Sequence, residues 1–300
     1  MTWLAWRQQR VSILTVLGII AVCAAVTAYI GIDLRAINAE NGGACEGGAC
    51  RPPSLSVILA NLWPWLLLLL VFMVGALTGG PLFAREAEKG THVLALTQSV
   101  SRIRWWATKL VLGLVPVVVA MLGLGLLNGW AMEPTYFSYG GPLLSPIFQT
   151  TGVALAAYTL FTFVVAAVIG SALKRTVGTV AITVGVFLVA SLAAVAFRPM
   201  YAEPEQITKP YGDENLFIET PEGALVIEHA HIDANGNNVS DEVFECLRTG
   251  CNVVAEYSTV YYHPIERYWP FQASEAAALT VLTVVIAAGG VWIMRTRYSR

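Results

Sequence analysis

Residues 149–197 read QTTGVALAAYTLFTFVVAAVIGSALKRTVGTVAITVGVFLVASLAAVAF. Lys174 and Arg175 are the only charged residues in this stretch. The apolar run on each side of them is long enough to cross a bilayer core, which takes roughly 20 helical residues. Because only Lys174, Arg175 and Thr176 join the two runs, the stretch predicts a tight hairpin of two membrane-spanning helices.

The rest of the chain has the same character. Hydrophobic residues make up 56% of it, charged residues only 13%, and the mean hydropathy is +0.62, whereas a soluble domain carries about 25% charged residues. The predicted fold is therefore an all-α integral membrane protein. Its six predicted transmembrane helices cover residues 11–32, 56–80, 108–131, 149–173, 177–198 and 272–294. The first run is longer than the apolar part of a signal peptide, so an uncleaved span is favoured over a cleaved leader.

The positive charges predict the orientation. With the N-terminus inside, the inner segments carry most of the Lys and Arg residues: Arg7, Arg10, Arg85, Lys89, Arg102, Arg104, Lys109, Lys174, Arg175, Arg295, Arg297 and Arg300. Only Glu86 and Glu88 are acidic on that side. The positive-inside rule therefore places both termini in the cytoplasm of a multi-pass protein of the bacterial cell membrane. Lys109 and Glu275 are expected near span ends, where their side chains reach an interface.

The predicted domains follow from these spans. Residues 1–10 form an amphipathic segment on the inner surface, and residues 11–198 contain spans one to five with a cytoplasmic loop at 83–108. Residues 199–269 form a small, acidic, mixed α/β extracellular domain between helices five and six. Within it we expect a strand at 225–232, a turn at 233–238, a short helix at 240–247 capped by Ser240, and an extended segment at 253–262. Residues 270–300 hold the last span and a basic tail.

Four cysteines fall in predicted outer segments, where disulfides persist. Cys45 and Cys50 lie in the first outer loop, and Cys246 and Cys251 lie in the outer domain. Four cysteines allow three pairings, of which two local bridges are favoured. No metal site is predicted, because neither the histidines nor the calcium-like turn around Asp233 has the spacing that zinc or calcium requires.

The energy source cannot lie within the predicted spans. Their interiors offer no ionisable residue of the kind that binds a driving ion, and no broken helix is evident. The chain also lacks a phosphate-binding loop, so we expect no enzymatic activity of its own and a partner that supplies the energy. The inner loop after the second span, a short charged helix followed by an apolar patch, suggests a docking surface. The alternative interpretation is a solvated connector.

This loop resembles that of the permease subunits of type-2 ABC exporters. The similar residues are Glu86, Glu88, Gly90, Thr91, Leu94, Leu96, Ser101, Arg102 and Lys109. The N-terminal segment Met1–Arg10 and the segment His263–Gln272 with Glu275 resemble the actinobacterial branch more closely. Together with the six spans, the resemblance covers essentially the whole chain.

The resemblance implies a transport subunit of a dimer, made with a second permease copy or a homologue. It binds no cofactor itself, whereas a separate ABC ATPase subunit binds ATP and Mg²⁺. The family's coupling loop falls on Glu86, Glu88, Gly90, Thr91, Leu94, Leu96, Ser101 and Arg102. Its pathway-lining spans are the second and fifth, which makes candidates of Asn61, Trp63, Trp65, Phe72, Phe187 and Phe197.

The implied function is ATP-driven outward transport. The apolar, uncharged spans favour a lipid-like or amphipathic cargo, and the acidic outer surface would attract cationic peptides or drugs. The expected partners are the ATPase, the second permease and membrane lipid, and no nucleic acid. The alternative is a membrane sensor or resistance scaffold that binds an extracellular ligand through the acidic outer domain.

Overall fold

The computed structural model describes residues 2–40, 55–88, 101–136, 140–212, 218–251 and 255–296. The chain forms two compact units. The helical unit comprises Met1–Pro134, Pro146–Ala194 and Gln272–Arg300, and the sheet unit comprises Thr135–Ser145 and Val195–Phe271.

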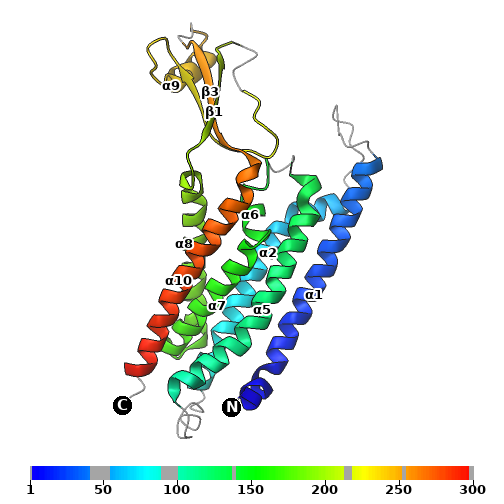
Figure 1. Ribbon diagram of the computed structural model, residues 1–300, viewed down its shortest axis with the longest axis vertical. Coiled ribbons are helices and arrows are strands. Elements are labelled where there is room, and N and C mark those ends of the chain that lie inside the picture. Colours follow the sequence, from blue (N-terminus) through cyan, green and yellow to red (C-terminus); the bar gives the residue numbers. More distant parts are fainter. Residues whose placement is uncertain are drawn as a thin grey trace. The chain divides into compact units, whose positions relative to one another are not determined.

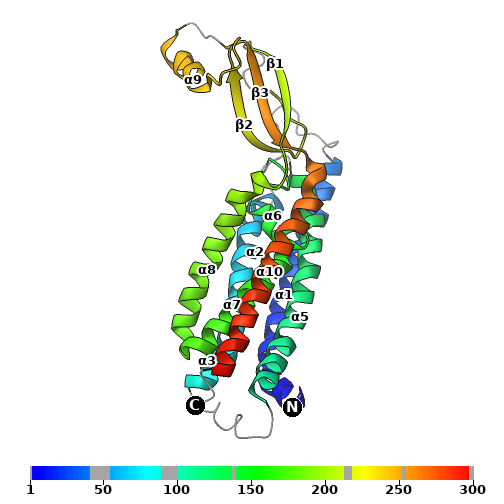
Figure 2. The same cartoon turned by 60° about the vertical axis from the view of Figure 1, so that its left-hand side comes forward.

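Among the described residues, six helices are long and apolar enough to cross a membrane, which confirms the predicted number of long apolar helices. They are α1 (Thr2–Glu40), α2 (Leu55–Gly79), α5 (Arg102–Met132), α7 (Ala154–Leu173), α8 (Thr176–Phe197) and α10 (Tyr268–Thr296). Two short helices, α3 (Pro81–Glu88) and α6 (Ile147–Thr150), lie at opposite ends of the bundle, which we call the α3 end and the α6 end (Figures 1 and 2). Helix α1 begins and α10 ends at the α3 end.

Helix α7 is the core of the helical unit. Within its apolar window 89% of the residues are buried, against 17% for α8 and 22% for α10. Helix α2 packs along α7, and α1 packs along α5, which in turn contacts α7. Within a helix the backbone N–H and C=O groups bond one another, which lets an apolar helix cross lipid; Pro64 in α2 and Pro116 in α5 lack an N–H to donate.

The structure corrects two expectations about the spans. The predicted fourth span, 149–173, is interrupted: α6 ends at Thr150, α7 begins at Ala154, and the three residues between them are not helical. Lys109 and Glu275 do not reach an interface, because their exposed fractions are 3% and 1%. Each lies about two turns inside its helix, where neighbouring side chains cover it.

The sheet unit contains three antiparallel strands in the order β1-β3-β2. Strands β2 (Leu225–Ile232) and β3 (Tyr257–His263) correspond to the predicted strand and extended segment, whereas β1 (Glu205–Pro210) was not expected. Strand β1 is exposed along most of its length, so it carries no alternating apolar pattern that sequence reasoning could detect. In chain order the sheet follows α8 and precedes α10.

Helix α9 (Ser240–Thr249) confirms the predicted short helix but not its cap. Val239 occupies the N-cap position without a side-chain hydrogen bond. The Ser240 hydroxyl instead accepts a hydrogen bond from the His231 N–H and donates one to Asn238. Ser240 therefore ties α9 to β2 rather than closing its own helix.

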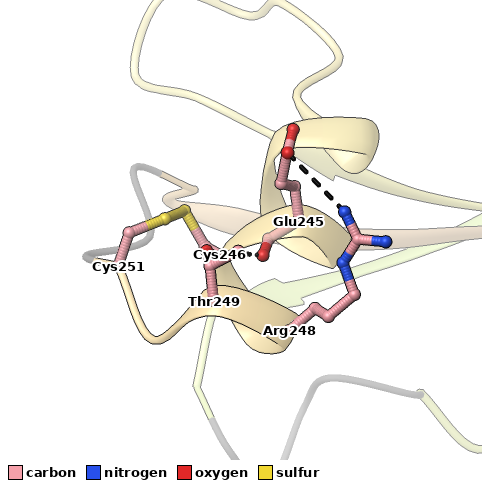
Figure 3. Close-up of a disulfide and its surroundings, with 5 residues drawn as sticks. All are labelled: Glu245, Cys246, Arg248, Thr249 and Cys251. Carbon is pink, nitrogen blue, oxygen red and sulfur yellow. Dashed lines mark hydrogen bonds and ion pairs between the residues drawn. A yellow bond between two sulfur atoms is a disulfide. The ribbon is translucent and has the colours of Figure 1, made fainter.

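A disulfide joins Cys246 to Cys251 at the C-terminus of α9 (Figure 3). Gly250, in the left-handed conformation with φ of 78°, ends the helix and donates its N–H to the Cys246 carbonyl. Cys45 and Cys50 lie outside the described residues.

The 233–238 segment is the predicted turn, in which one Asp233 carboxylate oxygen accepts the N–H groups of Asn235 and Asn237 at 2.8 Å. The hydrogen bonds from Asn237, and then those from Asn235, lower the pKa of the Asp233 carboxyl.

Candidate functional site at the α3 end

Helix α3 continues the hydrogen bonding of α2 through a one-residue turn. Gly80 follows the last residue of α2, and Pro81 opens α3, the first helical position, at which proline is common. The Gly80 N–H bonds the Ala76 carbonyl at 3.1 Å, and the Ala84 N–H bonds the Gly80 carbonyl at 3.2 Å. Helix α3 is therefore firmly attached to the end of α2.

One face of α3 packs against α5. The Phe83 ring stacks on Trp106 with ring centres 5.8 Å apart and meets the edge of Trp105 at 5.7 Å. The Trp106 indole N–H in turn donates to the Ser171 hydroxyl of α7 at 3.2 Å. Aromatic pairs of this kind add about 0.5–1.5 kcal/mol beyond the area they bury. This buried face fixes the rotation of α3 about its own axis.

The turn before α3 approaches α7 closely because Gly170 has no side chain. A Cβ atom on Gly170 would lie 2.6 Å from the Gly80 carbonyl oxygen and 3.6 Å from the Ala84 side chain. The first distance is shorter than any normal contact, so a larger residue would push α3 away from α7. The contact thus depends on glycine at position 170.

The last residue of α3 binds the first residue of α8. One Glu88 carboxylate oxygen accepts the Thr176 backbone N–H at 2.7 Å, and the other lies 3.0 Å from the Thr176 hydroxyl, which donates to it. A helix N-terminus has unpaired N–H groups and a partial positive charge, which favour a carboxylate there. The Thr176 N–H, and then its hydroxyl, lower the pKa of the Glu88 carboxyl from its ordinary value of 4.5, and Arg85 adds a smaller effect.

These contacts make α3 a junction of four long helices. It continues α2, stacks on α5, touches α7 and holds the start of α8. A displacement of α3 would therefore alter its contacts with α2, α5, α7 and α8 together. Sequence reasoning missed Thr176 and Ser171 as partners, because no local pattern shows which residues of other helices meet α3; Thr176 lies 88 residues from Glu88 along the chain.

The predicted coupling residues fall partly within the described chain. Glu88 and Ser101 are described with their side chains. Ser101 is the N-cap of α5, and its hydroxyl accepts the Arg104 N–H. Glu86 in α3 and Arg102 in α5 are placed by their backbone alone. Gly90, Thr91, Leu94 and Leu96 lie outside the described residues. Lys109 lies over the Trp105 ring at 4.8 Å, beside the aromatic face that receives Phe83.

The predicted pathway residues do not form one cluster. Trp63 is buried and donates its indole N–H to Thr27 of α1 at 2.9 Å. Asn61 is exposed, and so are Trp65 and Phe197, both at 58%. Phe72 and Phe187 do meet, with ring centres 6.4 Å apart, and Phe187 also contacts Tyr158. Their role in lining a pathway stays a prediction.

The fold and this site define a class: a multi-pass helical membrane protein in which a short helix at one end of the bundle ties several spans together. The chain belongs to the ABC-2 membrane transporter related family, whose model matches residues 17–198. The match runs from within α1 to the end of α8 and includes the whole α3 junction. The searches of curated proteins and of solved structures gave no match. Membership makes the chain a permease component of an ABC transporter, and it implies an ABC ATPase partner.

Proposed function

We propose that this chain is the membrane half of an ATP-driven exporter of the actinobacterial branch and that the ATPase subunit docks at the α3 end. The observation that carries the proposal is the α3 junction. A helix fixed to several spans can transmit a movement of the bound ATPase to those spans. ATP and Mg²⁺ bind to the ATPase, whose hydrolysis supplies the energy. Glu86, Glu88 and residues 90–102 form the docking surface.

The charges at the α3 end support its assignment to the cytoplasm. Arg7, Arg10, Arg85, Lys174 and Arg175 are exposed there. Basic residues at short inner segments are typical of cytoplasmic loops. In this orientation both termini are cytoplasmic in the bacterial cell membrane, and the acidic sheet unit is extracellular, where the Cys246–Cys251 disulfide persists. A second permease copy or homologue completes the transporter, with lipid around it.

The composition of the spans supports the proposed cargo class. The apolar spans suit a lipid-like or amphipathic cargo better than a small ion, and an acidic outer surface attracts cationic peptides or drugs. The proposed outward direction rests on the resemblance of the 83–102 loop to that of exporters.

The test is co-purification with the ATPase, followed by measurement of ATP hydrolysis by the reconstituted complex. We expect Glu88→Ala to leave the ATPase bound but to reduce the stimulation of ATP hydrolysis that the permease gives. Glu245→Ala is the matched control, because it removes another exposed glutamate, which lies in α9, and should change nothing. A chain that transports without an ATPase, or normal stimulation in Glu88→Ala, would contradict the proposal.

A further inference from the structure

The structure closes the α6 end of the bundle with helix α6. Its four residues, Ile147–Thr150, are each at most 2% exposed, and they pack against α2, α5 and α7. An isolated helix this short is not stable, because forming the first turn costs more than its few hydrogen bonds return. The position of α6 is therefore set by the side chains that hold it.

Two of these side chains come from α8 and α10, long helices that are mostly exposed. The Gln149 amide of α6 donates to the Ser191 hydroxyl of α8 at 2.9 Å. Gln272 of α10 reaches into the break between α6 and α7: its amide N–H donates to the Phe148 carbonyl at 2.7 Å, and its oxygen accepts the Ala154 N–H at 2.8 Å. Gln272 thereby replaces backbone hydrogen bonds that the interrupted helix lacks.

Helix α5 holds the other side of the break. Asn128 donates to the Thr150 carbonyl at 3.0 Å, and the Gly152 N–H bonds the Gly125 carbonyl at 2.9 Å. Gly152 has a φ of 59°, a left-handed conformation that glycine adopts without strain. The break is thus a defined turn between α6 and α7, bonded on this side to α5.

The hold on α6 is incomplete. The side-chain oxygen of Asn128 is buried and has no hydrogen-bond partner among the described residues. An unsatisfied buried acceptor destabilises the conformation that buries it. Movement of α6 that admits water to Asn128 removes this penalty and so lowers the cost of leaving the closed position.

We propose that α6 is a gate at the end of the bundle opposite the ATPase, and that Gln149, Ser191 and Gln272 are the positioning residues that hold it shut. The proposal rests on the proposed transport function. Helix α8 provides the link, since it is bound to α3 through Glu88–Thr176 at one end and to α6 through Ser191–Gln149 near the other. A shift of α3 that moves α8 pulls on Ser191 and releases Gln149.

The gate is tested by cysteine accessibility in the full chain assembled with its ATPase partner in membrane vesicles. Ile147→Cys places a thiol on the buried face of α6, and a membrane-impermeant maleimide is applied from the α6 side. The parent chain, with its native cysteines, gives the background. We expect slow labelling at rest and faster labelling during ATP hydrolysis.

In the Ile147→Cys background, Gln149→Ala and Ser191→Ala should each accelerate labelling at rest by about fivefold, the effect of one hydrogen bond. Ser191→Thr keeps the hydroxyl and should restore the slow rate. Thr183→Ala is the control: it removes another buried α8 hydroxyl, which bonds only the Thr179 carbonyl of its own helix, and should leave the rate unchanged.

Each outcome decides a separate point. Labelling that ATP does not accelerate, in a complex that still hydrolyses ATP under control of this chain, overturns the gate and leaves the proposed function standing. Acceleration by ATP without an effect of Gln149→Ala or Ser191→Ala overturns the assignment of the positioning residues. An ATPase that does not bind the chain overturns the proposed function instead, while the resting rates still measure whether Gln149 and Ser191 hold α6.

Discussion

Glu88 acts at the scale of one residue as the cap of a helix to which it does not belong. Its carboxylate receives the first N–H of α8 and the hydroxyl beside it. Because these donors favour the ionised form, the pKa of Glu88 lies below 4.5 in the folded protein. Because the pKa of Glu88 is lower in the folded than in the unfolded protein, its contact stabilises the fold fully at pH values above the unfolded pKa. The stabilisation is lost as the pH falls through the folded pKa.

We therefore expect the contact between α3 and α8 to persist through neutral and mildly acidic solution and to fail only below about pH 4.5. The measurement is the titration of carbon-13-labelled glutamate carboxyls by NMR in detergent, with Glu88→Gln to assign the signal. Thr176→Val removes the hydroxyl donor and should raise the pKa of Glu88 part of the way back. A pKa of Glu88 at or above its ordinary value would show that the contact does not form.

The second residue-scale feature is a carboxylate inside the bundle. Glu275 accepts the Tyr158 hydroxyl at 2.7 Å, and both side chains are buried. Their contact joins α10 to α7 one turn after the Gln272 amide does. It explains why Glu275, expected at an interface, is instead covered by the helices around it.

Tyr158→Phe should lower the free energy of unfolding by about 0.5–1.5 kcal/mol, because it removes a buried hydrogen bond without leaving a large cavity. Thermal unfolding in detergent measures the loss. Tyr29→Phe is the control, since Tyr29 is 52% exposed and its hydroxyl should contribute little. Equal melting temperatures for Tyr158→Phe and the wild type would indicate that the buried hydrogen bond adds no stability.

At the scale of elements, the position of α3 depends on how closely its turn approaches α7. Gly170 permits that approach, whereas a Cβ atom on Gly178 or Gly185 of α8 would have no neighbouring atom within 4 Å. The three glycines occupy helices of similar composition but differ in their neighbours. They therefore separate a packing requirement from helix propensity.

Gly170→Ala should destabilise the protein and reduce the stimulation of ATP hydrolysis, because the new methyl group overlaps the Gly80 carbonyl and displaces α3. Overpacking of this kind typically costs about 1–3 kcal/mol. Gly178→Ala and Gly185→Ala should be neutral or slightly stabilising, by up to about 1 kcal/mol, since alanine is the better helix former. If all three variants show the same stability and the same stimulation of ATP hydrolysis, the close approach at Gly170 is not required for either.

At the scale of the whole molecule, the chain forms two compact units. The sheet unit has its own buried cluster of Ile218, Ala224, Val260 and Tyr262. Its ends meet within the unit, since Glu205 pairs with Tyr262 across the sheet and Arg267 forms an ion pair with Glu205 at 2.9 Å. The segment between them can therefore be removed without stretching the chain that remains.

Replacing residues 204–265 with a short Gly-Ser linker should leave the stimulation of ATP hydrolysis close to that of the intact chain. The reason is that the contacts of α3 all lie in the helical unit. Glu88→Ala in the same shortened chain should again reduce it. Complete loss of stimulation on deletion alone would favour the sensor interpretation, in which the acidic unit controls the rest of the protein.

The sequence predicted the features that follow from local composition. Apolar runs of sufficient length define the six long helices, because an apolar helix is the simplest way to satisfy the backbone in lipid. The alternating pattern and turn residues predicted β2 and α9, whereas the exposed strand β1 had no such pattern. The resemblance of the 83–102 loop led to Glu88 but gave no indication of its partner.

The tertiary structure decided which distant residues meet. Glu88 with Thr176, Gln272 with Phe148 and Ala154, and Tyr158 with Glu275 are pairs separated by 88 residues or more. Nothing local specifies such pairs, since their formation depends on the rotation and spacing of whole helices. The break between α6 and α7 has the same origin: an apolar run predicts a continuous helix, and hydrogen bonds supplied by α5 and α10 help to stabilise the interruption at 151–153.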